Sequence, residues 1–107
     1  MPVRSAAMRL WVEPAVIDEI AALPGNMRQR VRHAVRDLLH DPRPAQSRPL
    51  DVPKDLAVEG VEARRLRMDH WRVIYVVDHE LDLISVMAVR RRPPYNYEDL
   101  GDLLGSL

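Results

Sequence analysis

Cysteine is absent from the sequence, histidine is scarce, and no apolar run reaches the length of a membrane helix. Without cysteine, the chain can form neither a disulfide bond nor a thiolate metal site. The histidines, His33, His40, His70 and His79, do not have the spacing of metal ligands, so we expect no metal and no cofactor. A membrane helix needs about 20 apolar residues, and the N-terminal residues lack the hydrophobic core of a signal peptide. We therefore expect a cytoplasmic protein.

Net charge is also absent, because 16 basic side chains balance 16 acidic ones, but the charges are distributed unevenly. The segment 64–92 contains seven arginines and four acidic residues, whereas 93–107 contains three acidic residues and no basic one. Every basic residue except Lys54 is an arginine, a ratio that a GC-rich genome also produces. The arginine cluster is therefore more informative than the overall arginine content, because a guanidinium forms paired hydrogen bonds to phosphate or carboxylate.

The hydrophobic pattern predicts one α+β domain spanning residues 1–107, which is long enough for a single core. Residues 8–12 are a candidate first strand. Two helices follow over residues 14–23 and 27–39, joined by Pro24-Gly25, with Asn26 as the expected N-cap of the second helix. Their apolar residues recur at helical spacing, which indicates an αα-hairpin with one apolar side.

The second half of the chain predicts an antiparallel sheet. Strands over residues 58–68, 71–77 and 81–89 are separated by connections of hairpin length. Residues 42–56 contain four prolines and no regular period, so we expect a loop there. A short C-terminal helix carries an apolar stripe of Leu100, Leu103, Leu104 and Leu107. The predicted order is β-α-α-β-β-β-α, with the helical hairpin packed against one face of the sheet.

Strand alternation sorts the clustered arginines. Arg65 and Arg67 share one face of their strand. Arg72 begins the central strand, and Arg91 follows the last strand, which an antiparallel meander returns to the same end of the sheet. We therefore expect Arg67, Arg72 and Arg91 to lie close together. Such a cluster is unfavourable without an anion, and a phosphodiester is the expected one. The alternative is a set of solvated arginines that pair with nearby carboxylates.

The aromatic residues divide into core and site candidates. Trp71 and Tyr75 have the same parity in a buried strand and are expected in the core. Tyr95 and Tyr97 follow the last strand, close to the arginines. A tyrosine there can stack on a base, donate to phosphate or act as a general base, or it can simply anchor the last helix. His70 lies in a tight turn beside the arginines and is a candidate for proton transfer or a plain surface residue.

Two segments resemble a known family. RLRMDHWRVIY (Arg65–Tyr75) and AVRRRPPY (Ala88–Tyr95) are similar to the hairpin and the C-terminal ending of the RelE/ParE toxins of bacterial type II toxin–antitoxin modules. The predicted order of elements is also that of the family. The resemblance extends from about Met8 to Leu104.

The resemblance implies a ribosome-dependent endoribonuclease that needs no metal and inhibits translation. RelE-type members cleave mRNA in the ribosomal A site: the ribose 2′-OH attacks the adjacent phosphate and leaves a 2′,3′-cyclic phosphate and a 5′-OH. By this resemblance, Arg72 stabilises the transition state, Arg91 binds phosphate or donates a proton, and Arg65 stands where RelE has a lysine. The implied partner of the nucleophile is Tyr95 or Tyr97, and the further phosphate-binding candidates are Arg67, Arg90 and Lys54.

This chain departs from the family pattern in the turn between the second and third predicted strands and in the type of its basic residues. Asp69-His70 occupy the turn where the family usually has a glycine. Arginines replace the family's lysines, and a guanidinium is too basic to act as a general base. Two tyrosines compete for the role of partner of the nucleophile. Their spacing from Arg91 favours Tyr95 by comparison with the short-ending family members and Tyr97 by comparison with RelE itself. No role is predicted for Arg64 or Arg92.

The resemblance also implies a protein partner and leaves two other functions open. A cognate antitoxin would form a hetero-oligomer with the toxin, contacting Leu100, Leu103 and Leu104, unless these leucines pack on the toxin's own sheet. One alternative is a ParE-type toxin that binds DNA gyrase without catalysis, although such toxins usually lack the arginine and tyrosine set. The other is a weakly active or inactive homologue, which the absence of net charge favours.

Overall fold

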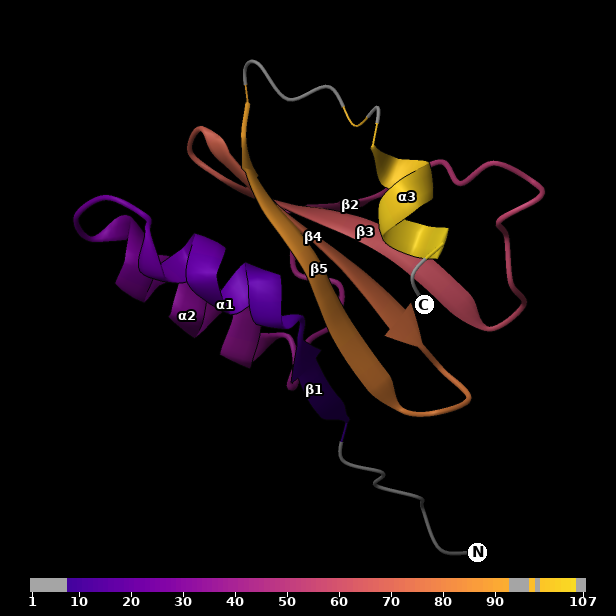
Figure 1. Ribbon diagram of the computed structural model, residues 1–107. Helices are drawn as coiled ribbons and strands as arrows, with labels where there is room; N and C mark the ends of the chain where they lie inside the picture. Colours follow the sequence, from indigo (N-terminus) through magenta and orange to yellow (C-terminus); the bar gives the residue numbers. More distant parts are fainter. Residues whose placement is uncertain (1–7, 93–96, 98, 106–107) are drawn as a thin grey trace, which may run out of the picture.

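The computed structural model, which describes residues 8–92, 97 and 99–105, contains a five-stranded sheet with helices on both faces (Figure 1). The elements are, in order, β1 (Arg9–Val12), α1 (Pro14–Ala21), α2 (Met27–Asp37), β2 (Ser47–Pro49), β3 (Val61–Met68), β4 (Trp71–Asp78), β5 (Leu83–Arg91) and α3 (Leu100–Gly105). The predicted α+β class is confirmed. The observed order contains one strand more than predicted.

The N-terminal helices form the predicted αα-hairpin. Pro14 is the first residue of α1, where its missing N–H removes no helical hydrogen bond. Gly25 takes a positive φ of 55° in the connection, which suits a residue without a Cβ atom. Asn26 precedes α2 as predicted, but its side chain makes no capping hydrogen bond. Its backbone is already helical (φ −71°, ψ −15°), whereas a capping residue usually has an extended conformation.

The sheet has the strand order β1-β5-β4-β3-β2. The three long strands pair antiparallel as predicted, whereas β1 lies parallel to β5 at one edge. No tight turn links β1 to its partner, because the helical hairpin follows it in the chain. A β-bulge at Met87 interrupts β5, since Ile74 pairs with Ala88 and Tyr75 pairs with Val86.

The segment 42–56, predicted as a loop, contains strand β2. Ser47 pairs with Leu66, and Pro49 pairs with Arg64, both in antiparallel register. A strand of three residues is too short to show a period, and Pro49 is tolerated because β2 is an edge strand. The strand predicted from residue 58 begins at Val61, because the chain turns at residue 60, a glycine with a φ of 81°.

The sheet separates two apolar layers. Helices α1 and α2 cover one face, where Val16, Val31 and Leu38 pack with Tyr75 among the buried residues. Helix α3 covers the other face, where buried leucines pack on Ile74, Met87 and Ala88 (Figure 1). Strand β4 is buried on both faces, as predicted, because residues 73–77 are all at most 2% exposed.

Tyr75 joins the sheet to the segment after α2. Its side chain is fully buried, and its hydroxyl donates a 2.7 Å hydrogen bond to the carbonyl oxygen of Pro42. Tyr75→Phe should lower the free energy of unfolding by about 1–2 kcal/mol, because the Pro42 carbonyl loses its donor. Urea unfolding would measure this change, with an unaltered m-value as the sign that compactness is preserved. Wild-type stability in the variant would show that this hydrogen bond contributes nothing.

Candidate functional site

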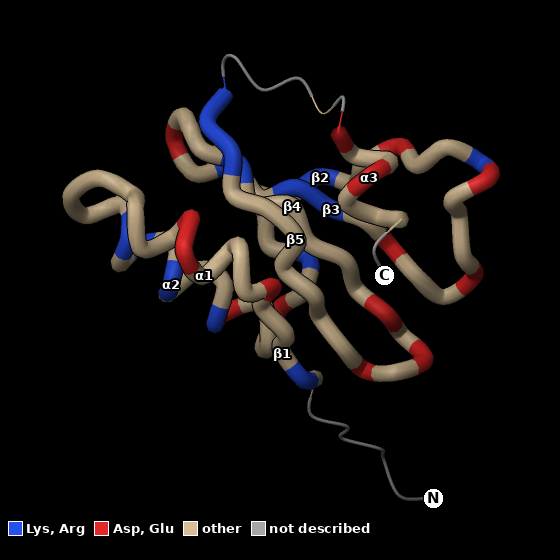
Figure 2. The backbone as a smooth tube through the Cα atoms, viewed as in Figure 1, with Lys and Arg blue, Asp and Glu red and all other residues tan. Residues whose placement is uncertain are grey.

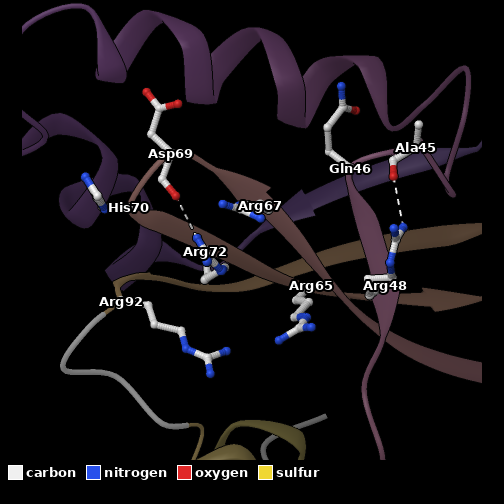
Figure 3. Close-up of a pocket in the computed structure, with 9 residues that line it drawn as sticks. All are labelled: Ala45, Gln46, Arg48, Arg65, Arg67, Asp69, His70, Arg72 and Arg92. Atoms are coloured by element: carbon white, nitrogen blue, oxygen red, sulfur yellow. Dashed lines mark hydrogen bonds between the residues drawn. The ribbon is translucent and has the colours of Figure 1, made fainter.

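A concave surface at one end of the sheet collects most of the clustered arginines (Figure 3). We call it the cationic pocket; it is open to solvent and has a volume of about 940 Å³. Figure 2 shows the corresponding concentration of basic residues along β2, β3 and the end of β5, while acidic residues gather at the opposite turns. The residues that line the pocket are Ala45, Gln46, Arg48, Arg65, Arg67, Asp69, His70, Arg72 and Arg92.

The register of β3 and β4 brings three of these arginines onto one face of the sheet. Arg67 pairs with Arg72, and Arg65 precedes Arg67 by two residues on the same strand. Arg48 of β2 pairs with Arg65 and extends the row to the edge strand. The sequence therefore predicted the shared face of Arg65 and Arg67 and the proximity of Arg67 to Arg72 correctly.

The β3–β4 turn holds two of the cations in place. The main-chain carbonyl of Asp69 accepts a 2.9 Å hydrogen bond from Arg72 Nη1, which also donates to the carbonyl of Trp71 at 2.9 Å. The next carbonyl, of His70, accepts a 2.6 Å hydrogen bond from the backbone N–H of Arg92. Asp69 has a φ of 54°, a backbone conformation that suits a residue without a Cβ atom and that asparagine and aspartate also tolerate.

The pocket carries a large excess of positive charge. Its described lining holds five arginines against one carboxylate, that of Asp69. This carboxylate is paired outside the sheet with Arg30 of α2, at 2.6 Å between Oδ2 and Nη1. The Arg30 guanidinium holds the pKa of Asp69 below its ordinary value. Repulsion among the remaining cations favours an anionic ligand.

Tyr97 lies beside the cationic pocket. Its ring centroid is 5.4 Å from the guanidinium carbon of Arg92 and 5.8 Å from that of Arg65, within the range of cation–π contact. Its backbone carbonyl also accepts a hydrogen bond from the N–H of Leu100, so the tyrosine joins the start of α3 to the arginines. Tyr95, the other predicted partner of the nucleophile, lies outside the described residues.

Three other predicted site residues do not line the cationic pocket, although one of them, Arg90, pairs with Arg72 in the register of β4 and β5. Arg91 pairs with Trp71, whose ring packs on the helix side, so the register places Arg91 on the sheet face opposite to Arg72. Arg90 Nη1 contacts Glu19 of α1 at 2.7 Å. Lys54, in the loop between β2 and β3, does not line the cationic pocket.

Arg92 lines the pocket although the sequence predicted no role for it. Without a bulge, alternation along β5 from Ile84 and Val86 would place Arg91 on the face opposite to the helical hairpin. The bulge at Met87 reverses the alternation, so Val89 faces the hairpin and Arg92 takes the pocket side. The reversal is visible in the packing, because the consecutive residues Met87 and Ala88 both contact the α3 layer.

The leucines predicted to bind an antitoxin pack on the chain's own sheet. Leu100 and Leu104 are 8% and 9% exposed, and Leu103 is partly buried against the same cluster. The described residues include no group of three or more histidine or acidic side chains arranged to hold a metal ion. No helix in the described part of the chain is long and apolar enough to span a membrane.

A separate charged network ties β3 to the segment before β2. Glu62 accepts hydrogen bonds of 3.0 Å from Arg43 and from Arg64, and the buried Arg64 also donates to Ser47 Oγ at 2.8 Å. This gives Arg64, for which no role was predicted, a structural one. The hydrogen bond from Arg43, supported by Arg64, holds the pKa of Glu62 below its ordinary value of 4.5.

The Glu62 network should make stability depend on pH in the acid range. A carboxyl group with a lowered pKa stabilises the fold above its ordinary pKa, and this contribution disappears as the pH falls through the folded-state pKa. Wild type should therefore lose stability more steeply than Glu62→Gln as the pH falls below 4.5. Denaturant unfolding at pH 7 and at several lower pH values would measure this, and Arg43→Ala should remove most of the same dependence. Parallel curves for wild type and Glu62→Gln would contradict the assignment.

Comparison with known proteins identifies the fold. No family model matches the sequence, and no curated protein matches it. Solved structures do match. The chain is similar to RelE in the archaeal RelE–RelB complex from Pyrococcus horikoshii OT3, with a TM-score of 0.71, 19% identity and coverage of 84% of this chain and 100% of that one.

Two bacterial structures give the same result. The toxin–antitoxin complex RelBE2 from Mycobacterium tuberculosis matches with a TM-score of 0.62 and 20% identity, covering 81% of this chain and 100% of that one. The isolated E. coli RelE toxin matches with a TM-score of 0.59 and 18% identity, covering 94% and 98%. The described chain therefore has the fold of the RelE toxins.

Proposed function

We propose that this chain is the toxin of a type II toxin–antitoxin module and acts as a ribosome-dependent, metal-independent mRNA endoribonuclease. The observation that carries the proposal is the cationic pocket, in which Arg65, Arg67, Arg72 and Arg92 gather beside Tyr97 on a RelE fold. Five guanidinium groups around an open surface suit a polyanionic strand better than a small neutral ligand. The ribosome would place this activity in the cytoplasm.

The reaction is an internal transesterification. The 2′-oxygen bonds to the adjacent phosphorus, the bond to the 5′-oxygen breaks, and the proton lost by the 2′-OH is balanced by one gained at the 5′-oxygen. The products are a 2′,3′-cyclic phosphate and a 5′-OH, so no water and no metal enter the balance. Catalysis then requires stabilisation of the extra negative charge on phosphorus-bound oxygens and transfer of one proton at each end.

The pocket residues suit these requirements. Arg72 is already oriented by two main-chain carbonyls, so its remaining donors can stabilise the phosphorane without reorganisation. Arg92 is the second cation on that face, and we assign it the phosphate-binding role that the sequence resemblance gave to Arg91. Tyr95, or Tyr97 once its buried hydroxyl is exposed, would orient or deprotonate the 2′-OH. Arg65 and Arg67 would bind the flanking phosphates.

A cognate antitoxin is the proposed protein partner. The structures matched include complexes of RelE with RelB. An acidic antitoxin segment would neutralise the cationic pocket, because the pocket holds five arginines and one carboxylate. Leu100, Leu103 and Leu104 could contact it only if α3 left its place on the sheet, since Leu100 and Leu104 are buried there.

Induced expression of the toxin gene, with primer extension on a reporter mRNA, tests the proposal. We expect growth arrest with cuts that follow the codon phase, and reversal by coexpression of the antitoxin. DNA-damage induction without mRNA cuts would instead identify a gyrase-binding toxin without catalysis. Continued growth at full expression would refute the assignment as an active toxin.

A further inference from the structure

Among the residues that the structure describes, Asp69 is the only carboxylate that lines the cationic pocket, and its position is fixed by the β3–β4 turn. Its main chain has a positive φ of 54° and accepts the hydrogen bond from Arg72, so the residue cannot move far without disturbing that arginine. Figure 3 shows the side chain directed away from Arg65 and Arg92. An acidic side chain at such a place would oppose phosphate binding if it turned into the pocket.

Arg30 holds that carboxylate on the outside. Its Nη1 atom lies 2.6 Å from Asp69 Oδ2, although the two residues are separated by 39 positions in the sequence. Arg30 projects from α2, which packs against the hairpin side of the sheet. The pair thus draws the carboxylate toward α2 and away from the pocket arginines.

The pocket contains alternative partners for this carboxylate. Arg67 and His70 also attract it electrostatically, and both line the pocket. If Arg30 were absent, the carboxylate would pair with these groups and cancel part of the positive charge with which the pocket would bind a phosphate. We propose that Arg30 is a positioning residue: it keeps the Asp69 carboxylate out of the cationic pocket and so leaves the arginines available to RNA phosphates. This inference rests on the proposed binding of RNA in that pocket.

Both partners are about half exposed, at 49% for Arg30 and 59% for Asp69, so the expected effect is moderate. Arg30→Gln should weaken RNA binding by about three- to fivefold, the range for an exposed ion pair. The Arg30→Gln/Asp69→Asn double variant should bind as tightly as Asp69→Asn alone, because no carboxylate remains to be displaced. Asparagine tolerates a positive φ, so Asp69→Asn keeps the turn intact.

The test is fluorescence anisotropy with a labelled 2′-O-methyl RNA oligonucleotide, which cannot be cleaved through its 2′ position. The full chain is used as wild type, the two single variants and the double variant. Arg32→Gln serves as a matched control, because Arg32 is also on α2 but lines a different groove, between α1, α2 and β1. This control should change affinity by less than about twofold. Urea unfolding would verify that each variant is folded.

The outcomes separate this inference from the proposed function. Recovery of affinity in the double variant supports the positioning role, because direct contact of Arg30 with RNA would leave the double variant as weak as Arg30→Gln. Failure of recovery, or equal losses for Arg30→Gln and Arg32→Gln, would overturn the inference while leaving the proposed function in place. No binding of the free oligonucleotide by wild type would overturn this inference, whereas the proposed function would still be decided by the cleavage assay on ribosomes.

Discussion

Arg72→Ala should lower the rate of mRNA cleavage on the ribosome by about a hundredfold or more. The Arg72 guanidinium is held in place, because the carbonyls of Asp69 and Trp71 each accept a 2.9 Å hydrogen bond from Nη1. A group that is fixed before the reaction stabilises developing charge without a reorganisation cost. Its loss therefore raises the free energy of the transition state more than that of the bound substrate. Single-turnover cleavage with saturating ribosomes would measure the rate.

Arg72→Lys provides the matched control for charge. Lysine retains one positive charge but lacks the planar fork that can donate to carbonyls and phosphate at the same time, so an intermediate rate is expected. Because Arg72 is only half-buried, urea unfolding should show little change in either variant. Wild-type cleavage by Arg72→Ala would remove this residue from the proposed mechanism.

Arg92→Ala and Arg91→Ala should differ sharply in activity, although the two residues are adjacent and both exposed. Arg92 lines the cationic pocket and contacts the Tyr97 ring, whereas Arg91 pairs with Trp71 on the opposite face of the sheet. We expect Arg92→Ala to lower cleavage by about 10- to 100-fold and Arg91→Ala to lower it by less than about threefold. The same ribosome assay measures both.

The reverse order of effects would be informative. A large loss for Arg91→Ala with a small loss for Arg92→Ala would restore the assignment made from sequence spacing. It would also mean that the chain after β5 rearranges on the ribosome. Equal small losses would show that neither arginine binds the reacting phosphate.

Local patterns predicted most of the fold. The 3.6-residue period identified α2, and the run of β-branched residues in β4 identified a strand buried on both faces. Strand β2 was not predictable, because three residues with a proline show no period and are held mainly by their pairing with β3. The parallel pairing of β1 with β5 was equally inaccessible, since it joins segments from opposite ends of the chain.

The candidate site was predictable only where strand alternation is regular. Arg65 and Arg67 alternate without interruption and were placed on the correct face relative to Arg72. Arg91 was chosen from its place at the end of the last strand and from the family resemblance. The bulge, which exchanges the faces of β5, places Arg92 on the pocket side instead, and the sequence alone does not locate that bulge. The Arg30–Asp69 pair depends on how α2 packs against the sheet, which no local pattern reveals.

Cleavage of a defined mRNA in the A site of purified ribosomes tests the central claim most directly. The account predicts that wild type produces a fragment ending in a 2′,3′-cyclic phosphate and a fragment beginning with a 5′-OH. It also predicts no cut when the nucleotide before the scissile phosphate carries a 2′-deoxyribose, because the nucleophile is then absent. An intact mRNA after incubation with wild type, or equal cleavage of the deoxyribose substrate, would contradict the account.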